Sequence, residues 1–160
     1  MAPGIDPHHL RYEVIRPVLR EMKMWSEAAE NLLMGTAAHE SRSGRYLRQI
    51  RGPARGLYQM EPATHVDLLT NYLRYRDELR DELGKFIAKA PGPVQQLSTN
   101  MAYATAAARL QYWRVPEALP EAQDIIGLAA YYKRHWNTFA GKATEFDFVR
   151  AYRKLPPYDL

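Results

Sequence analysis

The spacing of the apolar residues is the feature that most restricts how this chain can fold. In segment after segment these residues recur three and four positions apart, which is the period of one face of an α-helix. The clearest stripe contains Trp25, Ala28, Ala29, Leu32, Leu33, Thr36 and Ala37. No segment alternates apolar and polar residues strictly, as a half-buried strand would. The sequence therefore predicts an all-α fold.

Capping residues, glycines and prolines divide the chain into expected helices. We expect these helices over residues 7–24, 26–40, 62–72, 75–90, 121–137 and 144–154, with a further one that begins at Ser98 or Thr99 and carries the alanine-rich face of residues 102–108. Pro17 is expected to kink or split the first helix. Ser26 and Thr144 are expected N-caps, and the glycine- and arginine-rich stretch 41–56 is predicted to be a loop.

Length and composition favour one compact domain over residues 1–160. A chain of 160 residues can bury a sizeable core without covalent cross-links. Hydrophobic residues make up 46% and charged residues 25%, as is ordinary for globular proteins. No internal repeat or change of composition marks a second domain, and no apolar run approaches the length of a membrane span.

Charge and cysteine content exclude some kinds of chemistry. The chain has no cysteine, which excludes disulfides, thiolate metal sites and a cysteine nucleophile. The five histidines lack metal-ligand spacing and no phosphate-cradling loop is present, so we expect neither a metal nor a cofactor. The net charge of +4 favours an anionic partner without choosing among nucleic acid, lipid and cell wall. The N-terminus lacks the apolar stretch of a cleaved signal peptide, so we expect synthesis in a cytoplasm without signal-dependent export.

The stretch from residue 32 to residue 64 carries the most specific information. It reads LLMGTAAHESRSGRYLRQIRGPARGLYQMEPAT: an apolar helix that ends in Glu-Ser, a loop, and a Gly-Leu-Tyr-Gln-Met-Glu-Pro-Ala-Thr segment. This stretch resembles the lytic transglycosylase family of the lysozyme-like superfamily. The residues that match the family pattern are Glu40, Ser41, Gly56, Leu57, Gln59, Pro62, Ala63 and Thr64. Tyr58, Met60 and Glu61 depart from it.

The resemblance implies a lysozyme-like fold with a catalytic cleft, and an enzyme that cuts peptidoglycan glycan strands. It implies that Glu40 is the catalytic acid, and that Ser41 and Gln59 hydrogen-bond either that acid or the sugar acetamido groups. Tyr58 could stack on a sugar ring or bond the acid. The same holds for Tyr131 or Tyr132, which match a later segment of the family loosely.

The role of Glu40 can also be argued from its position. A glycosidase acid must keep its proton at neutral pH, so its pKa must be raised. Glu40 continues the apolar stripe, four residues after Thr36, and burial there disfavours the charged form. The negative end of the helix dipole acts in the same direction. The alternative is that Glu40 merely closes a helix on the surface, as most glutamates would.

Glu61 and the arginine run leave alternatives open. Glu61 could be a second carboxylate that activates water for hydrolysis, or an N-cap of the helix that starts at Pro62, and the cap is favoured. We keep Glu61 among the substrate-binding candidates. The arginines of residues 42–55 are expected to form a solvated face or to contact wall carboxylates. Nucleic-acid binding is not expected, because aromatic residues do not interleave this run as a stacking platform requires.

The leading hypothesis is therefore a small muramidase of bacteriophage type that cleaves the MurNAc–GlcNAc bond by transglycosylation. Such a protein would reach the cell wall and periplasm either within a virion tail or baseplate or as a released endolysin. Its partners would be glycan strands and, in a virion, other tail or baseplate proteins. The alternative is a lysozyme-like structural component of a tail or baseplate with weak or no activity, for which the terminal Pro-Pro-Tyr-Asp-Leu sequence would suit docking.

Overall fold

The predicted all-α architecture is confirmed by a computed structural model, which describes residues 4–137 and 141–155. Within these ranges the chain contains helices and no strand, apart from isolated bridges that fold the loop around Arg55 onto itself. One hydrophobic core draws side chains from Leu10 near the start to Val149 near the end. No helix in the described ranges is long and apolar enough to cross a membrane. The terminal segment 156–160 lies outside the described residues.

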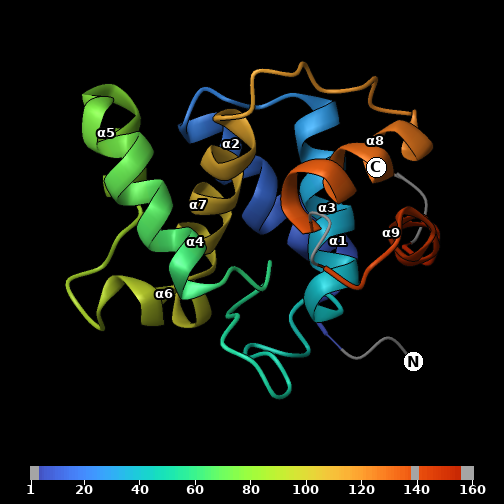
Figure 1. The fold of residues 1–160 in the computed structure, drawn as a ribbon, viewed down its shortest axis with the longest axis horizontal. Coiled ribbons are helices and arrows are strands. Elements are labelled where there is room, and N and C mark those ends of the chain that lie inside the picture. The colour runs from blue at the N-terminus through green and yellow to red at the C-terminus, as the bar shows by residue number, and fades with distance from the viewer. Residues whose placement is uncertain (1–3, 138–140, 156–160) are drawn as a thin grey trace.

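The N-terminal helical run is continuous and changes type instead of breaking at Pro17. It comprises α1 (Pro7–His9), the π-helical segment η1 (Leu10–Ile15) and α2 (Arg16–Glu21), shown in blue in Figure 1. Proline lacks an N–H donor, and its ring crowds the carbonyl four residues earlier. The wider π-helical turn just before Pro17 accommodates both the missing N–H donor and the proline ring. Such π-bulges commonly mark where a helix is perturbed.

The helix α3 (Glu27–Ser41) is enclosed by the rest of the molecule. Its N-cap is Ser26, as predicted, whose hydroxyl accepts a hydrogen bond of 3.0 Å from the Ala29 N–H. Every residue from 29 to 37 is buried, so burial extends all round the helix and is not confined to the predicted stripe. The helices α7 (Met101–Trp113), α8 (Ile125–Tyr132) and α9 (Glu145–Arg153) all pack against α3 (Figure 1).

A buried ion-pair cluster joins α3 to the N-terminal run. The carboxylate of Glu30 is fully buried and accepts hydrogen bonds from the guanidinium groups of Arg11 and Arg16, each with a shortest N···O distance of 2.6 Å. The Trp25 indole N–H donates to the same carboxylate over 3.1 Å. Burial alone would raise the pKa of Glu30, but the donors Arg16, Trp25 and Arg11 outweigh it and lower the pKa. Glu30 is therefore held as a charged group inside the protein.

The prediction of a helix over residues 75–90 is wrong in its extent, and the helix before α7 was missed. The structure has α4 (Pro62–Asp67), the short segments η2 (Leu68–Tyr72) and η3 (Leu73–Tyr75), α5 (Asp77–Gly84) and α6 (Pro93–Thr99). Side chains of the α6 region hold the segment after α5 in an irregular path. Gln96 hydrogen-bonds both the N–H and the carbonyl of Ala88, and Asn100 donates to the Phe86 carbonyl.

Two other predicted boundaries move because a stronger cap lies nearby. The helix α7 begins after Asn100, not Ser98 or Thr99, because the Asn100 side chain accepts from the Tyr103 N–H. The helix α8 begins after Asp124, not at residue 121, because Asp124 accepts from the Gly127 N–H. It continues into the π-helical segment η4 (Lys133–Asn137). The predicted Thr144 cap of α9 is confirmed, in a reciprocal capping box with Asp147.

We predict that Glu30→Gln lowers the free energy of unfolding by about 3 kcal/mol, because it removes the buried negative charge that pairs with Arg11 and Arg16. Chemical denaturation at neutral pH measures this change. The matched control is Glu27→Gln on the same helix, which removes a partly exposed carboxylate bonded to Gln123. Equal losses in the two variants would contradict the role assigned to Glu30.

Candidate active site

A cavity of about 910 Å³ lies beside the C-terminal end of α3 and contains the proposed acid. Its lining comes from the end of α3, from the loop that leads into α4 and the first turn of α4, from Gln111 of α7, and from η4 with residues 141–143. The polar residues that line it include His39, Glu40, Gln49, Arg51, Gln59, Glu61, Thr64, Gln111, His135, Asn137 and Lys142. The sequence stretch with the family resemblance thus supplies one side of a single hollow.

Glu40 is mostly buried at this cavity, and its environment keeps it protonated to unusually high pH. Burial raises its pKa from 4.5 to about 7, and a hydrogen bond from Tyr132 opposes this rise. The Tyr132 hydroxyl donates to Oε1 of Glu40 over 2.5 Å. At neutral pH the carboxyl is therefore poised between its acid and base forms, which is the condition for efficient proton transfer in both directions.

Tyr132 is held in place by a stack of aromatic residues. Its ring lies 5.1 Å from that of Phe148 on α9 and meets the His39 ring edge-on at 5.8 Å, measured between ring centroids. Phe148 in turn lies directly against Gly35 of α3, where an added Cβ would come within 2.2 Å of the Phe148 ring. Burial raises the pKa of Tyr132 well above its usual value, so its hydroxyl remains a donor to Glu40.

Gln59 lines the same cavity as Glu40 although nineteen residues separate them. Its backbone adopts a positive φ of 48°, and its side-chain amide donates to the carbonyls of Gly56 and Tyr46. Gly56 also has a positive φ, of 81°, and a Cβ there would sit 1.7 Å from the Leu97 carbonyl oxygen. A glycine is therefore required where this loop packs on α6.

Four of the predicted substrate-binding residues are buried and do not line the cavity: Ser41, Tyr58, Tyr131 and Tyr132. Each is at most 1% exposed. The Ser41 hydroxyl donates to the Ala37 carbonyl and accepts from the Gly44 N–H, so it fastens the loop to the helix end. The Tyr58 hydroxyl pairs with Thr105 at 2.8 Å. The Tyr131 hydroxyl donates to the Glu117 carbonyl at 3.0 Å. Ser41, Tyr58 and Tyr131 serve the packing of the protein in this structure.

Glu61 occupies the N-cap position of α4 but makes no side-chain capping hydrogen bond in that helix. Its side chain is exposed and lines the cavity. Glu61 therefore occupies the predicted N-cap position, but its carboxylate does not make the hydrogen bond that a capping residue would make. The cavity therefore holds two carboxyl groups of different exposure, Glu40 and Glu61.

Sequence reasoning missed the contributions of α7 and η4 to the cavity. Gln111 of α7 lines it, and its side-chain carbonyl oxygen is buried without a hydrogen-bond partner among the described residues. Trp136 of η4 also lines it and lies 5.0 Å from the Tyr112 ring. His135, a third lining residue, is hydrogen-bonded to Glu117. Helical spacing was an available signal, because Trp136 follows Tyr132 by four residues and so shares its face.

Two of the arginines of residues 42–55 line cavities, and they line different ones. Of the arginine run in residues 42–55, Arg51 lines the cavity and Arg42 lines a different hollow described below. Within residues 4–137 and 141–155, no group of three or more histidine, aspartate or glutamate side chains is arranged to hold a metal ion.

Comparison of the chain with protein-family models, with curated proteins and with solved structures finds no match.

We predict that Glu40→Gln stabilises the protein at high pH and not at low pH. The folded pKa of about 7 lies above the unfolded value of 4.5, so the folded state holds its proton longer. Wild-type stability therefore falls as pH rises between these values, by roughly 3 kcal/mol in total. Chemical denaturation at pH 4 and pH 8 should show a higher free energy of unfolding for the variant than for the wild type only at pH 8. A difference that does not change with pH would contradict the raised pKa.

We also predict that Tyr132→Phe raises the pKa of Glu40 above its present value, because the hydrogen bond it removes favours the carboxylate. The stability cost should be about 1 kcal/mol, since the aromatic ring is retained. Carbon-13 NMR titration of the Glu40 carboxyl measures the shift. The control is Tyr131→Phe, whose hydroxyl bonds a backbone carbonyl, and which should leave the Glu40 titration in place.

Proposed function

We propose that this chain is a glycosidase that cleaves peptidoglycan glycan strands, with Glu40 as its acid, and that its helical fold is lysozyme-like. The observation that carries the proposal is the buried carboxyl of Glu40, with a pKa of about 7, at the wall of a 910 Å³ cavity that Gln59 also lines. A retained proton is the property that a glycosidase acid requires at neutral pH. The family resemblance of residues 32–64 supplies the substrate class.

The chemistry expected of this arrangement is a proton transfer followed by its reversal. The protonated Glu40 gives its proton to the glycosidic oxygen as the MurNAc–GlcNAc bond breaks. The Tyr132 hydroxyl then stabilises the carboxylate that remains, because it donates to Oε1. The carboxylate next accepts the proton of a hydroxyl group of the same substrate as that oxygen attacks the anomeric carbon. The product is an anhydro-muramic end, and no water is consumed.

Cations at the cavity suit a substrate that bears carboxylates. Arg51 and Lys142 both line the hollow. The stem peptides of peptidoglycan carry carboxylates that such side chains can bind.

Glu61 supports a second route, hydrolysis. Its exposed carboxylate lines the same cavity and could activate water on the far side of the sugar from Glu40. A reducing end would then form in place of the anhydro end. We favour the route with Glu40 alone, because the N-cap position of Glu61 at the start of α4 already accounts for that carboxylate, and because the family that residues 32–64 resemble uses a single glutamate.

The experiment is mass spectrometry of purified wall fragments after incubation with the protein. We predict anhydro-muramic products, and Glu40→Gln should reduce their rate of formation by a hundredfold or more, on the order of what acid catalysis contributes. Fragments formed at full rate by Glu40→Gln would contradict the role of Glu40. Complete absence of fragments with the wild type would favour the structural component of a phage tail or baseplate.

The matched variant is Glu61→Gln, which removes the second carboxyl of the cavity. Under the proposed route it should leave both the product type and most of the rate unchanged. Reducing-end products that disappear selectively in Glu61→Gln would instead establish hydrolysis.

A further inference from the structure

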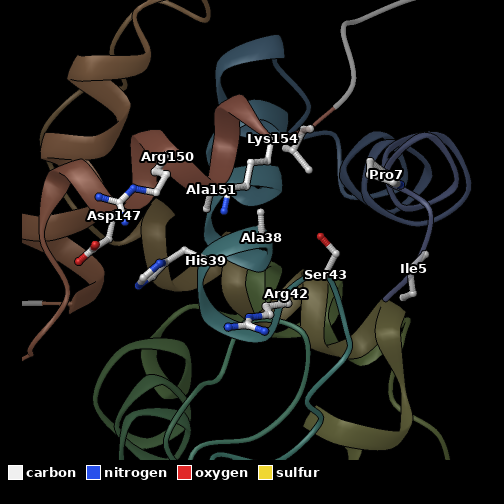
Figure 2. A pocket seen from close by; sticks show the side chains of 11 residues that line it. Ile5, Pro7, Ala38, His39, Arg42, Ser43, Asp147, Arg150, Ala151 and Lys154 are labelled. Carbon is white, nitrogen blue, oxygen red and sulfur yellow. The ribbon is translucent and has the colours of Figure 1, made fainter. Parts of the chain in front are cut away.

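A second cavity, of about 610 Å³, lies on the other side of His39 from the one that holds Glu40. Its walls come from the N-terminal segment, from the end of α3 with the loop after it, and from α9 (Figure 2). His39 lines both cavities, whereas Glu40 lines only the first. None of the residues assigned to glycan cleavage above lines this second hollow.

The charge of this cavity is mainly positive. Arg42, Arg150 and Lys154 line it, and none of the three forms an ion pair with a described residue. Asp147 also lines it, but its carboxylate accepts a hydrogen bond from the Thr144 N–H in the capping box of α9. Arg150 lies beside Asp147 and helps to lower the pKa of that carboxyl, so Arg42 and Lys154 are the cations whose charge is left without a partner at this hollow, which favours an anionic ligand.

Apart from His39 and Ser43, the rest of the lining is apolar. It consists of Ile5, Pro7, Ala38, Ala151 and Leu155. Figure 2 shows Arg42 on one side of the hollow and Lys154 on the other, with Ala38 between them. An apolar floor between cations suits a ligand that joins a negative group to short aliphatic groups. A bare inorganic anion would leave the apolar lining in contact with water.

The wall formed by the N-terminal segment is held by close backbone contacts. The Ile5 N–H donates to the Ser43 carbonyl over 2.8 Å. Gly4 approaches so closely that an added Cβ would lie 2.4 Å from the Arg42 carbonyl oxygen. Arg42 and Ser43 themselves have positive φ values of 51° and 54° at the end of α3. The hollow is therefore enclosed by a segment fitted to this turn.

We propose that this cavity binds the C-terminal end of a short peptide with small side chains. The carboxylate would be bound by Arg42 and Lys154 through charge-assisted hydrogen bonds. Methyl-sized side chains would lie against Ala38 and Ala151. The volume is within the range of roughly 300–1,000 Å³ that small-ligand sites occupy. This inference does not depend on glycan cleavage by Glu40.

The test is NMR titration of the full chain with N-acetyl-Ala-Ala and with its C-terminal amide, which lacks the negative charge. The acid should cause saturable shifts of the Ala38 and Ala151 methyl signals and of the His39 ring. The amide should bind at least about tenfold more weakly, because the charge-assisted bonds are lost. Equal affinities, or the absence of saturable binding by the acid, would overturn the proposal. The proposal would also be overturned if inorganic phosphate bound as tightly as the peptide acid and shifted the same signals.

Variants locate the site on α9 and on the N-terminal wall. Lys154→Gln should weaken binding of the acid about tenfold, whereas Arg153→Gln should leave it unchanged. Arg153 is the matched control because it is an exposed cation of the same helix that does not line the cavity. Gly4→Ala should weaken binding without a change of charge, because the added methyl group displaces the wall at Ile5.

Equal effects of Lys154→Gln and Arg153→Gln would show a general charge effect and would refute the site. Glu40→Gln should bind the peptide like the wild type. Failure of peptide binding is thereby distinguished from failure of the proposed glycosidase activity.

Discussion

The buried carboxylate of Glu30 constrains how the helices pack together. Two arginines of the N-terminal run must reach it, so that run is fixed against α3, and α3 becomes the axis around which the later helices pack. Ten residues along the same helix, Glu40 is mostly buried but forms no ion pair with a described residue. One helix thus carries one carboxyl held charged and another whose pKa is raised to about 7. The difference arises from the donors that surround each group and not from their position in the chain.

Local signals in the sequence were sufficient for most of the fold. Helical spacing gave the all-α class, and the hydroxyls of Ser26 and Thr144 gave two helix starts. The errors occurred where side chains distant in sequence hold the backbone. Gln96 and Asn100 fix the segment after α5 in a way that no local pattern records. The enclosure of α3 was also missed, because burial on every side depends on how many helices surround it.

The candidate site was predictable in part. The motif placed Glu40 and Gln59 at one cavity, and burial on the apolar stripe gave the direction of the Glu40 pKa. A tyrosine within a motif looks the same in sequence whether it faces a sugar or fills the core. Tyr58 and Tyr131 fill the core, while Tyr132 reaches the acid. The adjacent tyrosines differ because successive helical residues point about 100° apart. Which of the two reaches the acid depends on tertiary packing.

The contact between Gly35 and Phe148 has a consequence for how this protein can vary. The ring of Phe148 occupies the space that any larger residue at position 35 would need, and the same ring supports Tyr132 beside Glu40. The two positions are therefore expected to change together in descendants of this chain. A larger residue at 35 would require a smaller one at 148, and the support for Tyr132 would then have to come from elsewhere. Such paired substitution would identify relatives that keep the acid even where the surrounding sequence has diverged.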